Sequence, residues 1–337
     1  MPERDFTAGG VLACPVDEHP AARAFRALRP DGATPERIEV LKGARPGARR
    51  SAYRLAGVGP GGSAVIAKRC PVVKARLERD VYEQVLPSLP VPTVRYYGFV
   101  EHADGGWLFL EDVGGHPRYS PDIHEHRRAA GRWLGFLHTR ATPAAAARLP
   151  VLDSAYYFDR LRSGRARIES ALSAPLEPVD QSLMRTILSQ CALLEAKWPA
   201  VEGRCRSMPK SLIHGDFVAK NIYVAAESGP PRLLPLDWGQ AGRGLPGVDL
   251  AQSLPSCHGL SADIDLEAYL EVVRGHWAGI GMPEVRAWAR TGTLLRTLVA
   301  VEWASRSLGR GMICGATAWL GAYADQLAHA ARALEGQ

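Results

Sequence analysis

The stretch "SLIHGDFVAKNIYV", residues 211–224, decides the fold of this 337-residue chain. It places His214, Asp216 and Asn221 between two apolar runs. The residues that follow, "IYVAAESGPPRLLPLDWG", predict two short strands joined by a turn at "ESGPP", because Gly and Pro interrupt the two apolar segments there. Such a hairpin brings Asp237 back beside Asn221 and Asp216. Three oxygen-bearing side chains are therefore expected to converge at the ends of two strands.

The side chains at this hairpin have the chemistry of a magnesium site. Carboxylate and amide oxygens are hard ligands, which Mg²⁺ prefers, together with phosphate oxygens, over nitrogen or sulfur. A further carboxylate that the metal does not need can accept a proton from an attacking hydroxyl group. The stretch therefore predicts a catalytic loop rather than simple strand caps.

The overall composition is that of an ordinary globular protein. Hydrophobic residues make up 46% of the chain and charged residues 23%, which is enough to bury substantial cores, and the length predicts about two domains. We find no uninterrupted apolar run of ~20 residues and no apolar segment at the N-terminus, so neither a membrane span nor a secretory signal is expected. The six cysteines lack metal-binding spacing and are interpreted as reduced thiols of a cytoplasmic enzyme. They are Cys14, Cys70, Cys191, Cys205, Cys257 and Cys314.

The basic charge balance invites comparison with nucleic-acid-binding proteins. The formal net charge is +6 and the isoelectric point is near 9.1. The arginines, however, are mostly isolated, as in "RLRSGRARIES", and carboxylates balance them locally. No five-residue basic block occurs, and aromatic residues are not interleaved with the basic ones. We therefore predict no nucleic-acid partner and interpret the charge as a solvated surface or a patch that attracts phosphates.

The chain divides into two regions with different patterns of secondary-structure signals. Residues 37–113 contain short strand-like runs between Gly-rich turns, including a hairpin signal at "HADGG". Residues 114–337 have a mostly helical pattern, rich in Ala, Leu and Arg, apart from the hairpin described above. The segment "VGGHP", residues 113–117, marks the boundary between them. Residues 1–36 carry little pattern beyond "AARAFRAL" and are interpreted as an N-terminal extension.

The ordered motifs of the large region resemble those of the aminoglycoside phosphotransferase and choline kinase-like family of small-molecule kinases. They read His-Gly-Asp followed by four residues and Asn, a hairpin, Asp-Trp-Gly, and then Asp-Leu-Ala in "GVDLAQSL". The Gly of the first motif occupies the position at which protein kinases carry Arg. The resemblance implies that Asp216 is the catalytic base and that Asn221 and Asp237 bind Mg²⁺. It also implies that Asp249 supports the catalytic loop, and His214 is interpreted as a brace of that loop rather than a catalyst.

A kinase fold also needs a lysine on a strand and a glutamate on a helix to hold the nucleotide phosphates. In "SAVIAKRC" the alternation of residues places Lys68 on a strand. In the helix "KARLERDVYEQVL", Glu78 lies on an apolar stripe, where an unpaired charge would be costly. Pairing with Lys68 removes this cost. The alternative places Lys68 at a sheet edge and Glu78 at the margin of the stripe, which otherwise contains Val81, Tyr82 and Val85.

Further nucleotide contacts are expected from two segments of the small region. The loop "KGARPGARRSAY", residues 42–53, could cover phosphates, with Ser51 as a hydrogen-bond donor. It contains neither a GxGxxG pattern nor a Walker A motif. The segment "FLEDVGG" resembles the hinge of the family, which implies that the backbone of Glu111 and Val113 meets the adenine of ATP. The resemblance extends over residues 37–255.

We therefore predict a two-lobed, protein kinase-like α+β fold with an antiparallel-sheet lobe over 37–113 and a mainly helical lobe over 114–337. The predicted activity is ATP- and Mg²⁺-dependent phosphoryl transfer to a hydroxyl group of a small molecule, such as an antibiotic, an amino sugar or an amino alcohol. A regulatory pseudokinase is an alternative, although all the motif residues are present. A protein kinase is another, although the Gly of the first motif and the lack of an Ala-Pro-Glu segment argue against it. His138, near the end of "HRRAAGRWLGFLHTR", is interpreted as a core residue.

The acceptor site is expected on the large lobe, on the helices that follow the second motif. In "TLLRTLVAVEWASRSL", residues 293–308, Glu302 falls on an apolar stripe beside Trp303. A carboxylate next to an indole can hold an ammonium group, so an amine or amino sugar in contact with both residues is predicted. Glu302 could equally pair with Arg296 or Arg306, and this alternative stays open.

Overall fold

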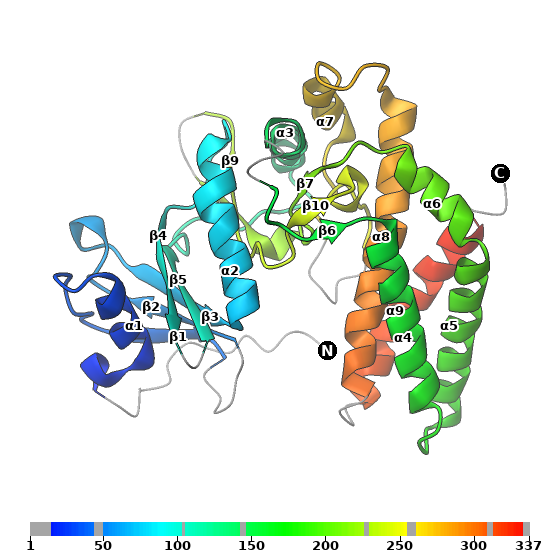
Figure 1. Ribbon diagram of the computed structural model, residues 1–337, viewed down its shortest axis with the longest axis horizontal. Helices are drawn as coiled ribbons and strands as arrows, with labels where there is room; N and C mark the ends of the chain where they lie inside the picture. Colours follow the sequence, from blue (N-terminus) through cyan, green and yellow to red (C-terminus); the bar gives the residue numbers. More distant parts are fainter. Residues whose placement is uncertain are drawn as a thin grey trace.

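The chain folds into two lobes that lie side by side in the computed structural model (Figure 1). One lobe is a small antiparallel sheet with helices packed on it, and the other is larger and mainly helical. The predicted two-lobed α+β fold is therefore confirmed. The structure describes residues 15–43, 50–102, 105–141, 146–225, 229–254, 261–308 and 313–332.

The small lobe is built on a five-stranded antiparallel sheet with the strand order β1-β2-β3-β5-β4. Alternate residues of a strand face opposite sides of a sheet. In β5, Trp107 and Phe109 accordingly lie in one apolar cluster and Leu108 lies in another. β4 and β5 pair as the predicted hairpin, although residues 103–104 of its turn lie outside the described residues. The strands are β1 (Ile38–Lys42), β2 (Ser51–Leu55), β3 (Val65–Cys70), β4 (Tyr96–His102) and β5 (Gly105–Glu111).

A helix from the N-terminal segment covers the side of this sheet that faces away from the helical lobe (Figure 1). This helix, α1 (Pro20–Leu28), buries Phe25 edge-on against Phe109, with the ring centroids 5.2 Å apart. Residues 20–28 thus contribute to the apolar core of the small lobe.

A second helix, α2 (Val72–Asp80), packs on the side of the sheet that faces the helical lobe (Figure 1). It continues through one π-helical turn, Val81–Val85. The predicted apolar stripe is confirmed, because Glu78 and the three apolar stripe residues are buried whereas Arg76 and Glu83 are exposed.

The large lobe is mainly helical, and α4, α5, α8 and α9 pack side by side at its far end (Figure 1). Its long helices are α3 (His124–Arg140), α4 (Ser154–Ala171), α5 (Pro178–Ala196), α6 (Trp198–Arg206), α7 (Leu266–Val273), α8 (Met282–Leu308) and α9 (Ile313–Arg332). Asp153 caps the start of α4 by accepting the Tyr156 N–H, as short polar side chains do at helix N-termini. Among the described residues, no helix is both long and apolar enough to cross a membrane. Among the described cysteines, Cys70, Cys191 and Cys205 are buried and free.

Short strands at the junction of the lobes position the motif residues. The predicted hairpin is confirmed as β8 (Ile222–Ala225) paired with β9 (Arg232–Pro235). β7 (Ser211–Ile213) leads into the loop of the first motif and pairs with β10 (Gly242–Gly244), which also pairs with β6 (Val151–Leu152). The two motif-bearing turns therefore lie next to each other between the sheet and the helices.

Candidate active site

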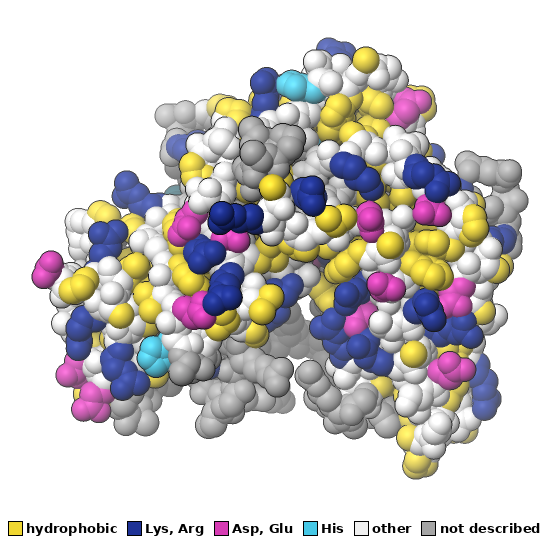
Figure 2. Space-filling model, in the orientation of Figure 1, with side chains coloured by type: hydrophobic (Ala, Val, Ile, Leu, Met, Phe, Trp, Pro, Cys, Tyr) yellow, Lys and Arg dark blue, Asp and Glu magenta, His cyan; other side chains and the backbone are white. Residues whose placement is uncertain are grey.

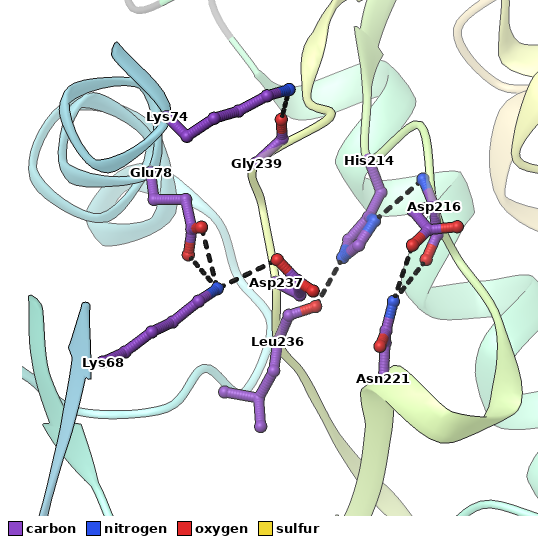
Figure 3. Close-up of polar contacts among 9 residues, drawn as sticks. All are labelled: Lys68, Lys74, Glu78, His214, Asp216, Asn221, Leu236, Asp237 and Gly239. Carbon is purple, nitrogen blue, oxygen red and sulfur yellow. Dashed lines mark hydrogen bonds and ion pairs between the residues drawn. The ribbon is translucent and has the colours of Figure 1, made fainter. Parts of the chain in front are cut away.

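Lys68 and Glu78 form an ion pair at the junction of the lobes, as Figure 3 shows. Lys68 lies on β3 and its Nζ donates to both carboxylate oxygens of Glu78 on α2, each at 2.8 Å. The same Nζ donates to Oδ1 of Asp237 at 2.9 Å. The structure therefore brings together the lysine and the glutamate that sequence reasoning paired, and it adds the aspartate of the second motif to the pair.

Burial and charge act in opposite directions on this cluster. Burial disfavours the charged form of Lys68, but the carboxylates of Glu78 and Asp237 outweigh burial and hold the pKa of Lys68 above its ordinary value. Burial also opposes ionisation of Asp237, yet the nearby ammonium of Lys68 lowers the pKa of Asp237 to about 2. Burial is the largest influence on Glu78, whose side chain is 2% exposed, and it raises the pKa of that carboxyl.

The carboxylate of Asp216 is held from two sides. The side-chain amide of Asn221 donates to Asp216 Oδ2 at 3.1 Å and to the Asp216 carbonyl oxygen at 3.0 Å (Figure 3). On the other side, Arg296 Nη2 donates to Asp216 Oδ1 at 2.6 Å. Both carboxylate oxygens are fixed in this way, and each retains lone-pair capacity for a further hydrogen bond.

Arg296 is the residue of this site that sequence reasoning missed. It lies on α8 and is buried, and its Nη1 donates to the carbonyl oxygen of Gly215 while its Nη2 binds Asp216. Only one signal was available in the sequence, namely an arginine among the apolar residues of "LLRTLVAV". That signal cannot say which of several carboxylates the guanidinium group binds.

Gly215 of the first motif has no room for a side chain, because the turn after the second motif lies directly against it. Gly215 has a φ of 74°, and a Cβ atom there would lie 2.2 Å from the carbonyl oxygen of Gln240. An L-residue would be strained in this conformation and would collide with the turn after Asp-Trp-Gly. The close approach of the two loops therefore explains the Gly at the position where protein kinases carry Arg.

His214 braces the loop, as its interpretation from the sequence suggested. Its ring is fully buried and lies 4.4 Å from the ring of Trp238. Nδ1 accepts the N–H of Asp216 at 3.2 Å, and Nε2 lies 3.1 Å from the carbonyl oxygen of Leu236, which places the ring proton on Nε2 (Figure 3). Burial lowers the pKa of His214, so the ring is neutral near pH 7.

Asp249 fastens the loop of the first motif to the large lobe. Its carboxylate accepts the backbone N–H groups of His214 and Gly215 at 2.6 and 2.8 Å. Oδ2 of Asp249 also lies 3.3 Å from Nε2 of His138, whose other ring nitrogen contacts the Tyr269 hydroxyl at 3.0 Å. His138 is thus a buried core residue with two partners, as interpreted from the sequence.

The turn of the second motif has an unusual backbone. Asp237 has a φ of 67°, a conformation that residues with a Cβ rarely adopt outside functional sites. Lys74 on α2 donates its Nζ to the carbonyl oxygen of Gly239 across the junction (Figure 3). The turn is therefore held from the small lobe by two lysines, Lys68 and Lys74.

The donor set fits a magnesium ion that shares its coordination with phosphate. Asn221 uses its side-chain nitrogen on Asp216, which leaves its oxygen as the ligand atom, and the side chain of Asp237 is 45% exposed. Within the described residues, no group of three or more His, Cys, Asp or Glu side chains could hold a metal alone. Two protein oxygens plus phosphate and water oxygens are what Mg²⁺ sites in kinases commonly use.

The structure shows only part of the surroundings of the other residues that were predicted to contact the nucleotide, namely Ser51, Glu111 and Val113. Ser51 is buried on β2, and its hydroxyl has no hydrogen-bond partner within the part of the chain that the structure describes. Residues 44–49 of the predicted phosphate loop lie outside that part. The N–H of Glu111 donates to the carbonyl oxygen of Arg95 at 2.9 Å. That donor is therefore used between neighbouring segments. Val113 is buried, and its carbonyl oxygen accepts a turn N–H.

Glu302 is surrounded by arginines rather than open to a ligand. Its side chain is 1% exposed and contacts Arg306 at 2.8 Å, Arg167 at 2.5 Å and Arg160 at 3.9 Å. Of the two interpretations of Glu302, the geometry favours pairing, and Arg306 is the partner named from the sequence that it meets. Trp303 is partly buried against the main apolar core.

Comparison with protein families gives one match that covers most of the chain. The family model described as the phosphotransferase enzyme family matches residues 40–288, which include every motif residue from Lys68 to Asp249. The match agrees with the resemblance found in the motifs. None of the curated proteins matches the sequence.

Solved structures with the same fold are phosphotransferases and kinases. A variant of aminoglycoside 2'-phosphotransferase-IIIa bound to GDP has a TM-score of 0.60 and 15% identity, over 91% of this chain and 95% of that one. A spectinomycin phosphotransferase with ADP and spectinomycin has a TM-score of 0.58 and 10% identity, over 90% and 94%. An ethanolamine kinase of Plasmodium vivax has a TM-score of 0.55 and 12% identity, over 85% and 81%. At these identities the likeness shows the fold.

Proposed function

Because the chain belongs to the phosphotransferase enzyme family, we propose that it transfers the γ-phosphoryl group of ATP to a hydroxyl group of a small molecule. The observation that carries the proposal is the convergence of two groups at the lobe junction. One group is Lys68, Glu78 and Asp237, and the other is Asp216 and Asn221. Structures with this fold hold ADP or GDP, which supports a purine nucleotide here.

In the proposed reaction, Asp216 orients the acceptor hydroxyl and takes its proton as the new O–P bond forms. The bond between the γ-phosphorus and the bridging oxygen of ATP breaks in the same step, and ADP leaves. Arg296 and Asn221 fix the carboxylate, so little reorganisation is needed when the proton moves. Lys68 donates hydrogen bonds to the phosphates, with Glu78 orienting its ammonium group. Because the transition state is loose, most of the rate enhancement comes from positioning and neutralisation of charge.

Asn221 and Asp237 would hold Mg²⁺ through their side-chain oxygens. When bound, Mg²⁺ neutralises negative charge that develops on the phosphate oxygens. The low pKa of Asp237, about 2, keeps this carboxylate ionised near neutral pH.

Two alternative functions carry less support. A pseudokinase would be expected to lack one of the groups that handle phosphates, whereas Lys68, Glu78 and Asp237 are already in contact. A protein kinase carries Arg in its first motif, whereas Gly215 of this chain leaves no space for a side chain. Acceptors of small size are therefore the better proposal.

The proposed function is tested with Asp216→Asn and a panel of hydroxyl compounds. Nucleotide consumption is measured for the wild type with ATP and with GTP, each with Mg²⁺. Asp216→Asn should bind the nucleotide within about twofold of wild type but lose 10²-fold or more in transfer, roughly the size expected for a lost general base. Turnover of the variant within tenfold of wild type would rule out Asp216 as the base.

A further inference from the structure

A small pocket lies beside the catalytic loop on the helical lobe. Its wall includes Tyr156 and Tyr157 from the first turn of α4, Gly215 of the loop, and Arg296 and Val299 of α8. Its volume is about 10 Å³, enough for about one water molecule, so an acceptor would lie at its mouth rather than inside it. Arg296 in its wall binds Gly215 and the proposed catalytic base Asp216, so an acceptor at the mouth would lie near that base.

One helical turn beyond this pocket, three arginines surround a single carboxylate. Glu302 follows the pocket residue Val299 by three positions on α8, which places it on the same face of the helix. Arg167 and Arg160 reach it from α4, and Arg306 reaches it from the next turn of α8. Three positive charges and one negative charge leave an excess of two positive charges.

The excess charge is exposed, whereas the carboxylate is not. The side chains of Arg160, Arg167 and Arg306 are 30%, 42% and 46% exposed. The guanidinium group of Arg160 stands over the ring of Tyr156 at 4.6 Å, and Tyr156 lines the pocket. The Nε of Arg160 is buried and has no hydrogen-bond partner among the described residues. A molecule bound at the mouth of the pocket, beside these side chains, would therefore meet guanidinium groups and not the Glu302 carboxylate.

Lys74 on the small lobe lies near charges of both signs. Burial is the main reason why the pKa of Lys74 is lowered; Arg50 and Arg306 lower it further, whereas Glu78 and Asp237 raise it. Figure 2 shows dark-blue side chains gathered on the side of the helical lobe that faces the sheet lobe. Asp216 is neutralised by Arg296, whereas Lys68 is shared between Glu78 and Asp237 and leaves one negative charge, so the two excess positive charges of the arginine cluster are reduced but not cancelled. An excess of positive charge attracts anions.

We propose that the acceptor is an anion, a hydroxylated small molecule whose carboxylate or phosphate group binds Arg160 and Arg306. This inference rests on the proposed function and names the substrate class of the same site. It replaces the amine predicted from Glu302 and Trp303, because an ammonium group would approach guanidinium groups there instead of a free carboxylate. Guanidinium groups bind carboxylates and phosphates through charge-assisted hydrogen bonds.

The test compares acceptors that share a hydroxyl pattern and differ in charge. One set is gluconate, glucose 6-phosphate, glucose and glucosamine, and a smaller set is glycerate, glycerol and 3-amino-1,2-propanediol. Transfer from ATP with Mg²⁺ is measured at constant ionic strength, and thermal stabilisation is measured in parallel with ADP and Mg²⁺ present. We expect kcat/KM to be about tenfold or more higher for an anionic member than for the amine of its set. The gluconate and glucose 6-phosphate arms distinguish a carboxylate from a phosphate.

Variants connect this preference to the arginines. Arg160→Met and Arg306→Met should each raise the KM of the anionic acceptor about tenfold and leave that of ATP unchanged. Arg167 remains beside Glu302 in both, and melting temperatures establish that the variants fold. Arg162→Met is the matched control, because Arg162 is exposed on the same helix and lies over Phe158.

The possible outcomes separate this inference from the proposed function. Preference for a neutral or amine acceptor, absence of any response to every anionic member, or an unchanged KM in both folded variants would each overturn the inference. If ATP with Mg²⁺ neither bound nor was consumed, the proposed function itself would fail.

Discussion

Arg296 holds two parts of the catalytic loop with one guanidinium group, because Nη1 binds the Gly215 carbonyl oxygen and Nη2 binds the Asp216 carboxylate. Arginine suits this task, since its planar fork presents donors in a fixed geometry that a lysine lacks. The residue is separated from Asp216 by 80 positions in the chain. Its role depends on how α8 is placed against the loop, and no local pattern in the sequence contains that information.

Arg296→Met should reduce kcat by roughly 10²-fold, because a misplacement of the base by about 1 Å has this effect. The KM for ATP should change little, since Lys68 and Asp237 are untouched. Single-turnover rates and nucleotide KM values are measured together. Arg296→Lys keeps the charge but not the fork and should recover only part of the rate.

The control for this experiment is Arg286→Met, an exposed position on the same helix. Since removal of one partner of a buried ion pair can cost about 3–5 kcal/mol, unfolding curves accompany the kinetics. A folded Arg296→Met with a rate within threefold of wild type would contradict a positioning role.

The neutral ring of His214 makes stability depend on pH. In the unfolded chain a histidine titrates near pH 6.5, whereas burial lowers the pKa of His214 in the folded protein. Below about pH 6.5 the unfolded state therefore binds more protons, and the folded state loses stability as the pH falls. His19 and His126 act in the same direction, because burial lowers the pKa of each.

His214→Gln should remove its share of this dependence. The free energy of unfolding is measured from urea curves between pH 7 and pH 5, and the decline should be shallower in the variant than in the wild type. Parallel declines in the two proteins would show that the buried ring is not responsible.

At the scale of elements, the sequence predicted those helices and strands whose formation depends on neighbouring residues in the chain. The hairpin β8–β9 followed from two apolar runs around "ESGPP", and the buried face of α2 followed from the spacing of Glu78 and its apolar neighbours. Ion pairs between side chains of different elements were predicted only where a charged residue had few candidate partners in the sequence, as for Lys68 and Glu78. For Glu302 the sequence offered two arginines, and the structure adds Arg160 and Arg167 from α4, which lies more than a hundred residues earlier.

Gly292 shows how closely α8 approaches the segment that carries Asp249. A Cβ atom on Gly292 would lie 1.6 Å from the carbonyl oxygen of Gly247, in the 3-10 turn Pro246–Val248 that immediately precedes Asp249. Helix propensity alone favours Ala over Gly by about 1 kcal/mol. Here the contact reverses that preference, because backbone must move to admit the methyl group.

Gly292→Ala should therefore destabilise the protein by about 1–3 kcal/mol, the usual effect of overpacking, and should lower kcat by displacing Asp249. Gly203→Ala on α6 is the matched control, since nothing lies within 4 Å of its would-be Cβ, and it should be neutral or stabilising. Denaturant midpoints of the two variants that shift in the same direction would refute the close approach.

For the whole molecule, the domain bounds 37–113 and 114–337 stay a prediction. A small lobe that began at residue 37 would lack α1, which covers one face of the sheet with Phe25 and Ala21. The pattern "AARAFRAL" is too short to distinguish a docked helix from a solvated one, so the sequence could not assign it. The burial of its apolar residues depends on packing against the sheet, where Phe25 contacts Phe109, and the sequence pattern does not contain this information.

Removal of residues 1–36 should lower the melting temperature and promote aggregation, because the outer face of the sheet becomes exposed. Phe25→Ala tests the same contact with one substitution and should cost about 3–5 kcal/mol. The exposed Arg26→Ala on the same helix is the control. A truncated chain that melts at the wild-type temperature would show that α1 is dispensable.

The ammonium group of Lys68 has three N–H donors, and in this structure it makes three hydrogen bonds, two to Glu78 and one to Asp237. All three of its N–H donors are therefore in use. An arriving phosphate can bind Lys68 only by displacing one of these acceptors, and Asp237 is the one with a single bond to lose. The displaced carboxylate is a proposed metal ligand, so each phosphate that binds Lys68 releases a site for the cation that accompanies it. Nucleotide and metal binding are then thermodynamically linked through one exchange of partners, and each raises the affinity for the other by the same factor.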